Sequence, residues 1–254
     1  MMINIKTTQT SALKTAFDGI NSLLNDANLE FDTDVGITLK EVDKTGRIFV
    51  HARFDKECFD NFEVYSNRTI GFDISGLNKC FKNANTFDVI TMQYDGGDKF
   101  KIVLESHTKK LKKTFLLRTL ELPIDTSSIK PIDFTHCITM GSKDFHTMCK
   151  ELSHYSDKIN ITVKPESVIF GCNSTIGEIE CERRSGNKLK IEYTDDATII
   201  ASYDLKYLLL FAKCADLSDV VELYIKNTYP LIMKYKLASL GELKLVLHQR
   251  HKEV

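Results

Sequence analysis

Apolar residues recur at helical spacing in several segments of the chain. In the first, Leu13 and Phe17 lie on one helical face, and Thr10 or Ser11 is a candidate N-cap. This pattern predicts an amphipathic helix from Ser11 to about Asp26.

A matching segment opens the second half of the chain. It follows the candidate N-cap Ser142, and Asp144 falls in its first turn, where the helix dipole favours a carboxylate. Its apolar residues repeat the helical spacing and predict a second amphipathic helix: Phe145, Met148, Cys149, Leu152 and Tyr155. The segments Ile74–Asn83 and Leu205–Cys214 predict two more helices, so each half has a pair.

Short alternating stretches between the helices predict strands. In the first half these are Glu30–Phe31, Gly36–Glu41, Arg47–Phe54, Phe62–Tyr65, Thr69–Phe72, Val89–Tyr94 and Phe100–Ser106. The last two flank Asp95-Gly96-Gly97-Asp98, which predicts a hairpin because glycine tolerates the positive φ of a tight turn. Strands outnumber helices, which predicts an α+β fold with helix pairs on antiparallel sheets.

The second half repeats the plan of the first. Under a shift of 131 positions, Asp73–Ala84 matches Asp204–Ala215, and both segments run into an apolar strand-like stretch. The matched pairs are Ile74 with Leu205, Leu77 with Leu208, Lys82 with Lys213, and Ala84 with Ala215. A period this long indicates duplication of a whole domain.

A proline-containing segment separates the two halves. Residues 121–131 include Pro123 and Pro131, and proline disfavours both helix and central strand. We therefore predict an N-terminal domain over 1–118, an extended surface linker over 119–133 and a C-terminal domain over 134–254.

Composition narrows the class of protein. The chain is 43% hydrophobic and 27% charged with a formal net charge of −1, so any attraction to nucleic acid must come from the distribution of charge. No apolar run approaches the roughly 20 residues that span a bilayer, and the N-terminus lacks a signal-peptide pattern. An odd number of cysteines, 7, without C-x-x-C, indicates reduced thiols. We expect an intracellular protein without membrane contact.

No pattern of catalytic chemistry is present. G-x-S-x-G, G-x-x-x-x-G-K-[ST], G-x-G-x-x-G and H-E-x-x-H are all missing, and the histidines are scattered singly. We predict no catalytic residues, no metal site, no cofactor and no enzyme activity.

Two segments carry a family resemblance. The stretch Cys149–Asp157, with Leu152-Ser153-His154, and the C-terminal stretch Tyr229–Lys244 together resemble proliferating cell nuclear antigen, the sliding clamp of eukaryotic and archaeal type. The match is collinear from Met2 to His248, and its departures suggest a divergent or viral member.

The resemblance implies a head-to-tail homotrimer whose helices line a hole around duplex DNA. Such a ring attracts phosphates without reading sequence. The positions that match the family's channel residues are Lys14, Lys79, Lys82, Lys150, Lys206 and Lys213, and Lys143 is a substitute near His146.

The ring also implies strand edges that pair between subunits. The matching segments are basic in one domain and acidic in the other, which favours pairing between unlike edges. Their residues are Lys109, Lys110, Lys112, Lys113 and Phe115 on one edge, and Glu178, Glu180 and Glu182 on the other.

The resemblance further implies a pocket for a short clamp-binding motif of DNA polymerase, the clamp loader and other replication or repair proteins. The matching positions are Val42, Leu122, Ile124, Ile129, Pro131, Phe134, Pro230, Val246 and His248. The expected site of action is the nucleus for a cellular member and a cytoplasmic replication site for a viral one. Two alternatives stay open, a subunit of a heterotrimeric checkpoint clamp and a scaffold that does not encircle DNA.

Overall fold

The computed structural model describes residues 2–43, 45–123, 133–237 and 239–250. Its backbone divides into two compact units. The first comprises Met1–Asp43, Val50–Ser127 and Lys236–Leu243, and the second comprises Lys44–Phe49, Ser128–Tyr235 and Lys244–Val254.

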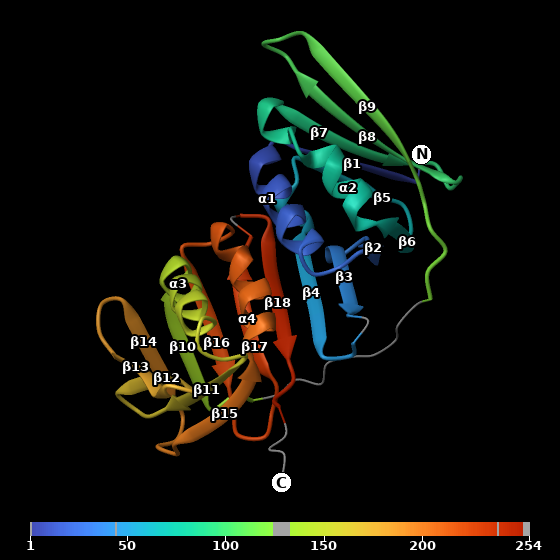
Figure 1. Ribbon diagram of the computed structural model, residues 1–254. Coiled ribbons are helices and arrows are strands. Elements are labelled where there is room, and N and C mark those ends of the chain that lie inside the picture. Colours follow the sequence, from blue (N-terminus) through green and yellow to red (C-terminus); the bar gives the residue numbers. More distant parts are fainter. Residues whose placement is uncertain (1, 44, 124–132, 238, 251–254) are drawn as a thin grey trace. The chain divides into compact units, whose positions relative to one another are not determined.

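In the first unit, helices α1 (Thr10–Asn21) and α2 (Ile74–Phe81) pack against each other (Figure 1). Short 3-10 turns follow at Lys56–Cys58 and Ala84–Thr86. The strands are β1 (Ile3–Thr7), β2 (Asp26–Asp32), β3 (Gly36–Val42), β4 (Ile48–Asp55), β5 (Asn61–Val64), β6 (Arg68–Asp73), β7 (Val89–Tyr94), β8 (Lys99–Ser106) and β9 (Leu111–Arg118).

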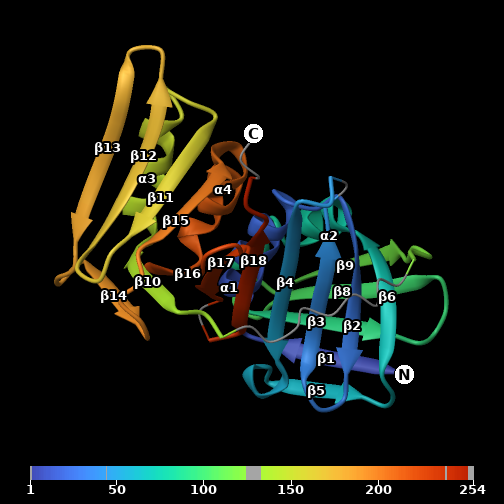
Figure 2. The same ribbon diagram turned by 90° about the horizontal axis from the view of Figure 1, so that it is seen from below.

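These strands form two antiparallel layers. One is the sheet β5-β1-β7-β8-β9, and the other is the run β4-β3-β2-β6. Figure 2 shows β1 and β5 crossing beneath the strands β4, β3, β2 and β6. The predicted hairpin is confirmed, because β7 pairs with β8 from Val89↔Glu105 to Tyr94↔Phe100.

The second unit contains helices α3 (Ser142–Leu152) and α4 (Leu205–Ala212), which lie side by side, and a 3-10 turn at Lys213–Asp216. Its strands are β10 (His136–Gly141), β11 (Lys158–Val163), β12 (Ser167–Ser174), β13 (Gly177–Arg184), β14 (Leu189–Tyr193), β15 (Ile199–Asp204), β16 (Val220–Ile225) and β17 (Leu231–Lys236). Strand β18 (Gly241–Leu247) begins in the first unit and continues in the second.

Strand order repeats between the two halves of the chain. The order β5-β1-β7-β8-β9 recurs as β14-β10-β16-β17-β18, and β6-β2-β3-β4 recurs as β15-β11-β12-β13. Each helix follows the corresponding strand, so α1 matches α3 and α2 matches α4. This correspondence is what duplication of a whole domain produces, as the sequence repeat predicts.

Phenylalanine dominates the core of the first unit. The ring of Phe17 on α1 lies 5.0 Å from that of Phe81 on α2 and 5.9 Å from that of Phe54 on β4. Phe100 contacts Phe72 edge-on at 5.0 Å. Offset and edge-on aromatic pairs add about 0.5–1.5 kcal/mol beyond area burial, so they fix the helix pair firmly on the sheets.

The core of the second unit is less aromatic and contains thiols. Cys149 on α3 and Cys214 after α4 are buried, and burial raises the pKa of each thiol to about 12. These cysteines therefore stay protonated and pack as small apolar side chains. All seven cysteines are free, as the sequence indicates.

Five predicted helix boundaries were wrong. Helix α1 ends at Asn21 rather than near Asp26, because Asp26 pairs with Asp73 in β2–β6 and the Ile74 N–H donates to the Asn25 carbonyl at 2.8 Å. The N-caps are Gln9 and Gly141, one residue before the predicted Thr10 and Ser142. Helix α2 ends at Phe81 with Lys82 as its C-cap, before the predicted end at Asn83. Helix α4 ends at Ala212, and the predicted end at Cys214 falls in the 3-10 turn that follows.

None of the helices in the described ranges is long and apolar enough to cross a membrane.

Candidate nucleic-acid interface and subunit edges

Lysines predicted to contact DNA lie on both helices of the first unit. Lys79 is in the last turn of α2 and Lys82 is its C-cap, and both side chains are exposed. Cations at a helix C-terminus are stabilised by the helix dipole. Lys14 differs, because its Nζ forms an ion pair with Asp18 Oδ2 at 2.6 Å on α1. The first helix therefore presents little net positive charge.

The second unit places a lysine pair on each helix. Lys143 and Lys150 lie on the same helical face of α3, two turns apart, and both are exposed. Lys206 opens α4 with its Nζ 4.7 Å from the Tyr207 ring centroid, and Lys213 is the C-cap. Within the described ranges, none of these lysines forms an ion pair. Their charge is available to a polyanion.

A position missed in the sequence is Asp18. By the repeat of α1 in α3, with Leu13 matching Phe145 and Ile20 matching Leu152, Asp18 occupies the position of Lys150. The signal was readable, because Lys14 and Asp18 are four residues apart, the spacing at which helical side chains meet.

Both predicted interface segments are sheet edges. Strand β9 is the last strand beyond β8, and β13 is the last strand beyond β12. Every residue of β9 pairs with β8 on one side, from Lys99↔Arg118 to Ser106↔Leu111, which leaves its other backbone edge open in the described part of the chain. An open edge is a template for strand addition.

Charge differs strongly between the two edges. Lys109 and Lys110 form the turn before β9, and Lys110 adopts a positive φ of 48°. Lys112 contacts Glu105 at 2.9 Å, and this hydrogen bond lowers the pKa of the Glu105 carboxyl. Lys113 lies 4.9 Å from the ring centroid of the half-buried Phe115.

On β13, alternation places Glu178, Glu180 and Glu182 on one face, all exposed. These carboxylates have no ion pair with any other described residue. The segments 109–113 and 178–182 therefore have opposite charge, and the strands β9 and β13 each pair with a described neighbour on one side only.

The predicted peptide-binding positions divide between the units. Val42, at the end of β3, and Leu122 belong to the first unit and are half-buried. The described start of the linker is fixed there, with Leu120 N–H donating to the Gly71 carbonyl at 2.8 Å and Asn28 Nδ2 donating to the Pro123 carbonyl at 2.9 Å.

The remaining described positions belong to the second unit. Phe134 meets Tyr224 edge-on at 6.0 Å, Val246 is buried on β18, and the His248 N–H donates to the Arg47 carbonyl at 3.3 Å. Pro230 is half-buried. Ile124, Ile129 and Pro131 lie outside the described residues, so a single pocket remains a prediction.

An ion-pair cluster anchors the chain after β18. Asp204, mostly buried before α4, receives Arg47 Nη1 on one carboxylate oxygen and Arg250 Nη1 on the other, each at 2.7 Å. The Arg250 N–H also donates to the Ser202 carbonyl at 2.9 Å. Residues 249–250 are thereby held on the edge of β15.

In the part of the chain that the structure describes, no three His, Cys, Asp or Glu side chains group closely enough to hold a metal ion.

Comparison with known proteins gives one family. The model of "Proliferating cell nuclear antigen, N-terminal domain" matches residues 2–128, and the model of "Proliferating cell nuclear antigen, C-terminal domain" matches residues 128–250. The chain is 26% identical over 253 residues to the "Probable DNA polymerase sliding clamp 1" of Paramecium bursaria Chlorella virus 1, covering 97% of this chain and 96% of that protein. It is 24% identical over 247 residues to "Proliferating cell nuclear antigen 2" of Drosophila melanogaster, covering 97% and 96%.

Proposed function

Because this chain belongs to the proliferating cell nuclear antigen family, it is a DNA sliding clamp, and we propose that it works as a homotrimeric ring that encloses duplex DNA. Clamps of this family are processivity factors and not enzymes. The observation that carries the ring is the presence, on one chain, of a free basic edge and a free acidic edge, β9 and β13.

The internal repeat supports the pairing of these edges. By strand order, β4 is the counterpart of β13, and β18 is the counterpart of β9. Within the first unit, the last residue of β4 bonds to the residue before β18, because the Asp55 N–H donates to the Leu240 carbonyl at 2.8 Å. The same kind of strand pairing between copies joins β9 of one subunit to β13 of the next. Repeated head to tail, this contact closes a ring.

The proposed DNA contact rests on the helix lysines. Helices α2, α3 and α4 and their C-caps carry six exposed lysines: Lys79, Lys82, Lys143, Lys150, Lys206 and Lys213. In a homotrimer each of these lysines occurs once per subunit. They attract phosphates without reading bases, so the clamp holds DNA at any sequence and slides along it. Lys14 contributes less because Asp18 neutralises it.

Partner binding is proposed at the positions named for the peptide pocket. The apolar character of Val42, Leu122, Phe134, Pro230 and Val246 suits a short hydrophobic motif carried by a DNA polymerase, a clamp loader or a repair protein. We place the chain at sites of DNA replication, and we retain the domain boundaries 1–118, 119–133 and 134–254.

Edge charge reversal combined with light scattering tests the ring. Three chains of 29.0 kDa give a particle of ~87 kDa. Reversing the basic edge with Lys109→Glu in the turn before β9 and Lys113→Glu on β9, or reversing β13 with Glu180→Lys and Glu182→Lys, should give monomers because like charges then face each other across the edge. Combining all four substitutions in one chain should restore the trimer, since the edges again have opposite charge.

Two results would contradict this proposal. A wild-type protein that stays at 29.0 kDa across micromolar concentrations excludes the homotrimer and favours a heterotrimeric clamp subunit. A four-substitution variant that remains monomeric while folding normally shows that β9 and β13 do not face each other.

A further inference from the structure

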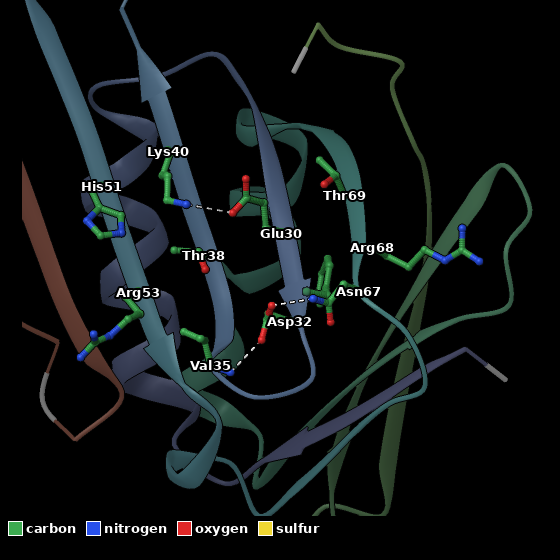
Figure 3. Close-up of a pocket in the computed structure, with 11 residues that line it drawn as sticks. Glu30, Asp32, Val35, Thr38, Lys40, His51, Arg53, Asn67, Arg68 and Thr69 are labelled. Atoms are coloured by element: carbon green, nitrogen blue, oxygen red, sulfur yellow. Dashed lines mark hydrogen bonds and ion pairs between the residues drawn. The ribbon is translucent and has the colours of Figure 1, made fainter. Parts of the chain in front are cut away.

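A polar hollow of about 400 Å³ lies on the first unit, beside the described start of the linker. Its walls come from β2, β3, β4 and β6 and the turns beside them (Figure 3). The lining residues that bear charge are Glu30, Asp32, Lys40, His51, Arg53 and Arg68. The volume is within the range of ligand sites.

The hollow occupies the sheet face opposite the helices. Side chains alternate along a strand, and the inward residues Leu29, Phe31 and Ile37 meet Leu13 and Phe17 of α1 in the core. Glu30 and Thr38 therefore point to the other face. A DNA duplex held by the lysines of α2 does not reach this surface, which favours a protein ligand.

Both carboxylates in the hollow already accept hydrogen bonds from neighbouring groups. Asp32 Oδ1 accepts the N–H groups of Asp34 and Val35 at 2.8 and 2.9 Å, and its Oδ2 accepts Asn67 Nδ2 at 2.7 Å. The backbone bonds hold the pKa of Asp32 below its ordinary value. Glu30 accepts Lys40 Nζ at 3.2 Å. Asp32 thus has three of its roughly four acceptor sites occupied, and Glu30 is paired with a cation.

Donor groups are in excess. An ammonium offers three donors and a guanidinium offers five, whereas Lys40 makes one such contact, and Arg53 contacts Asp55 at 2.8 Å through Nε. Arg68 is exposed at the rim and forms no side-chain interaction with any described residue. A surface with spare charged donors and occupied carboxylates is complementary to oxyanions.

The same face already carries an extended segment. The Leu120 N–H donates to the Gly71 carbonyl on β6, and Asn28 Nδ2 on β2 donates to the Pro123 carbonyl. Asn28 and Gly71 are paired across the two strands, two residues from the pair of Glu30 and Thr69 that lines the hollow. The chain can thus lie extended across these strands beside the hollow.

We propose that this hollow binds an acidic segment of an extended partner peptide, with Lys40, Arg53 and Arg68 donating hydrogen bonds to its carboxylate or phosphate oxygens. The site is separate from the motif pocket and adds selection for partners with an acidic flank. It requires neither ring closure nor DNA.

Fluorescence anisotropy with labelled hexaglutamate, hexalysine and a phosphoserine hexapeptide tests the proposal on the full chain. Hexaglutamate should bind and hexalysine should not, and tighter binding of the phosphoserine peptide would identify phosphate as the preferred oxyanion. Arg68→Glu should weaken hexaglutamate binding roughly tenfold, as expected for loss of one charge-assisted hydrogen bond. Glu30→Gln should strengthen it roughly threefold because Lys40 loses its internal partner.

The matched control is Lys99→Glu, an exposed lysine on β8 outside the hollow, which makes the same change in net charge. It should leave hexaglutamate binding within about twofold, as an exposed charge outside the site does. Equal losses for Lys99→Glu and Arg68→Glu, or preference for hexalysine, would overturn the proposal. The proposal would also be overturned if a short DNA duplex competed with hexaglutamate and if Arg68→Glu weakened the binding of that duplex. Light scattering on the same variants separates these outcomes from failure of the ring.

Discussion

Lys14 shows how one side chain changes the charge of a helix. Within the described part of the chain, it alone among the lysines proposed to face DNA has a carboxylate partner, Asp18, one turn along α1. An exposed pair at this spacing is worth only about 0.3–0.5 kcal/mol to stability. Its larger effect is on function, because the ammonium points at a carboxylate rather than at a phosphate.

Removing Asp18 should therefore strengthen DNA binding. We expect Asp18→Asn to raise the affinity for duplex DNA roughly threefold at low salt, since each subunit regains one free cation. Lys14→Ala in the natural background should change affinity little, whereas the matched Lys150→Ala should weaken it. Fluorescence anisotropy against salt concentration measures all three, and an unchanged affinity for Asp18→Asn would place α1 away from DNA.

At the scale of elements, glycines fix where the strands turn. Gly36 starts β3 with φ 126°, and a Cβ there would lie 2.1 Å from the Phe54 carbonyl oxygen. Gly177 starts β13 with φ 133° but faces open space, and Gly97 has neither constraint. At Gly36 a side chain would meet both backbone strain and a steric clash, at Gly177 only backbone strain, and at Gly97 neither.

Alanine substitution at these glycines should give a graded loss of stability. Gly177→Ala should cost about 1–3 kcal/mol from the backbone conformation alone. Gly36→Ala should cost more than about 3 kcal/mol, because displacement of the β4 backbone adds to that strain. Gly97→Ala should stay within about 0.5 kcal/mol. Urea unfolding gives the three values, and equal losses at Gly36 and Gly177 would mean that β4 moves at little cost.

Elements were predictable where the periodic signal was long and local. The four helices, the hairpin from Val89 to Ser106 and the repeat all follow from spacing in the sequence. The end of α1 could not be predicted, because Leu23 and Leu24 continue the apolar pattern of the helix. Asp26 instead pairs with Asp73, so the chain forms strand β2 from Asp26 onward. Strand β1 also went unpredicted, since its five residues resemble any short N-terminal segment.

Site residues divide in the same way. The helix lysines and the charged edge strands could be proposed from the sequence, because the family resemblance aligns segments that each belong to one element. The hollow is not, because Lys40, Arg53 and Arg68 come from three separate strands whose neighbourhood only the sheet order defines. The cluster of Arg47, Asp204 and Arg250 is hidden for the same reason.

For the whole molecule, a net charge of −1 leaves electrostatic attraction to DNA weak on average. A clamp with a few exposed lysines per chain cannot rely on affinity to remain bound at physiological salt, where each phosphate contact is costly to maintain. Closure around the duplex removes that dependence, because a closed ring leaves only at a DNA end. Electrostatics and topology therefore make separate contributions to retention.

Threading onto DNA with blocked ends separates the two contributions. The clamp is added to a linear duplex with one open end, the end is then blocked with a bulky protein, and retention is measured through a high-salt wash. The natural chain should be retained only on the blocked duplex. Lys82→Ala, Lys150→Ala and Lys213→Ala combined should reduce the salt dependence of initial binding, by ~0.9 in the log–log slope per lost contact. The clamps of this variant that do thread should still be retained on blocked DNA, because the ring remains closed. Loss of retention on blocked ends by the natural protein would contradict encirclement, whereas an unchanged salt slope in the triple variant would contradict only the placement of these lysines beside DNA.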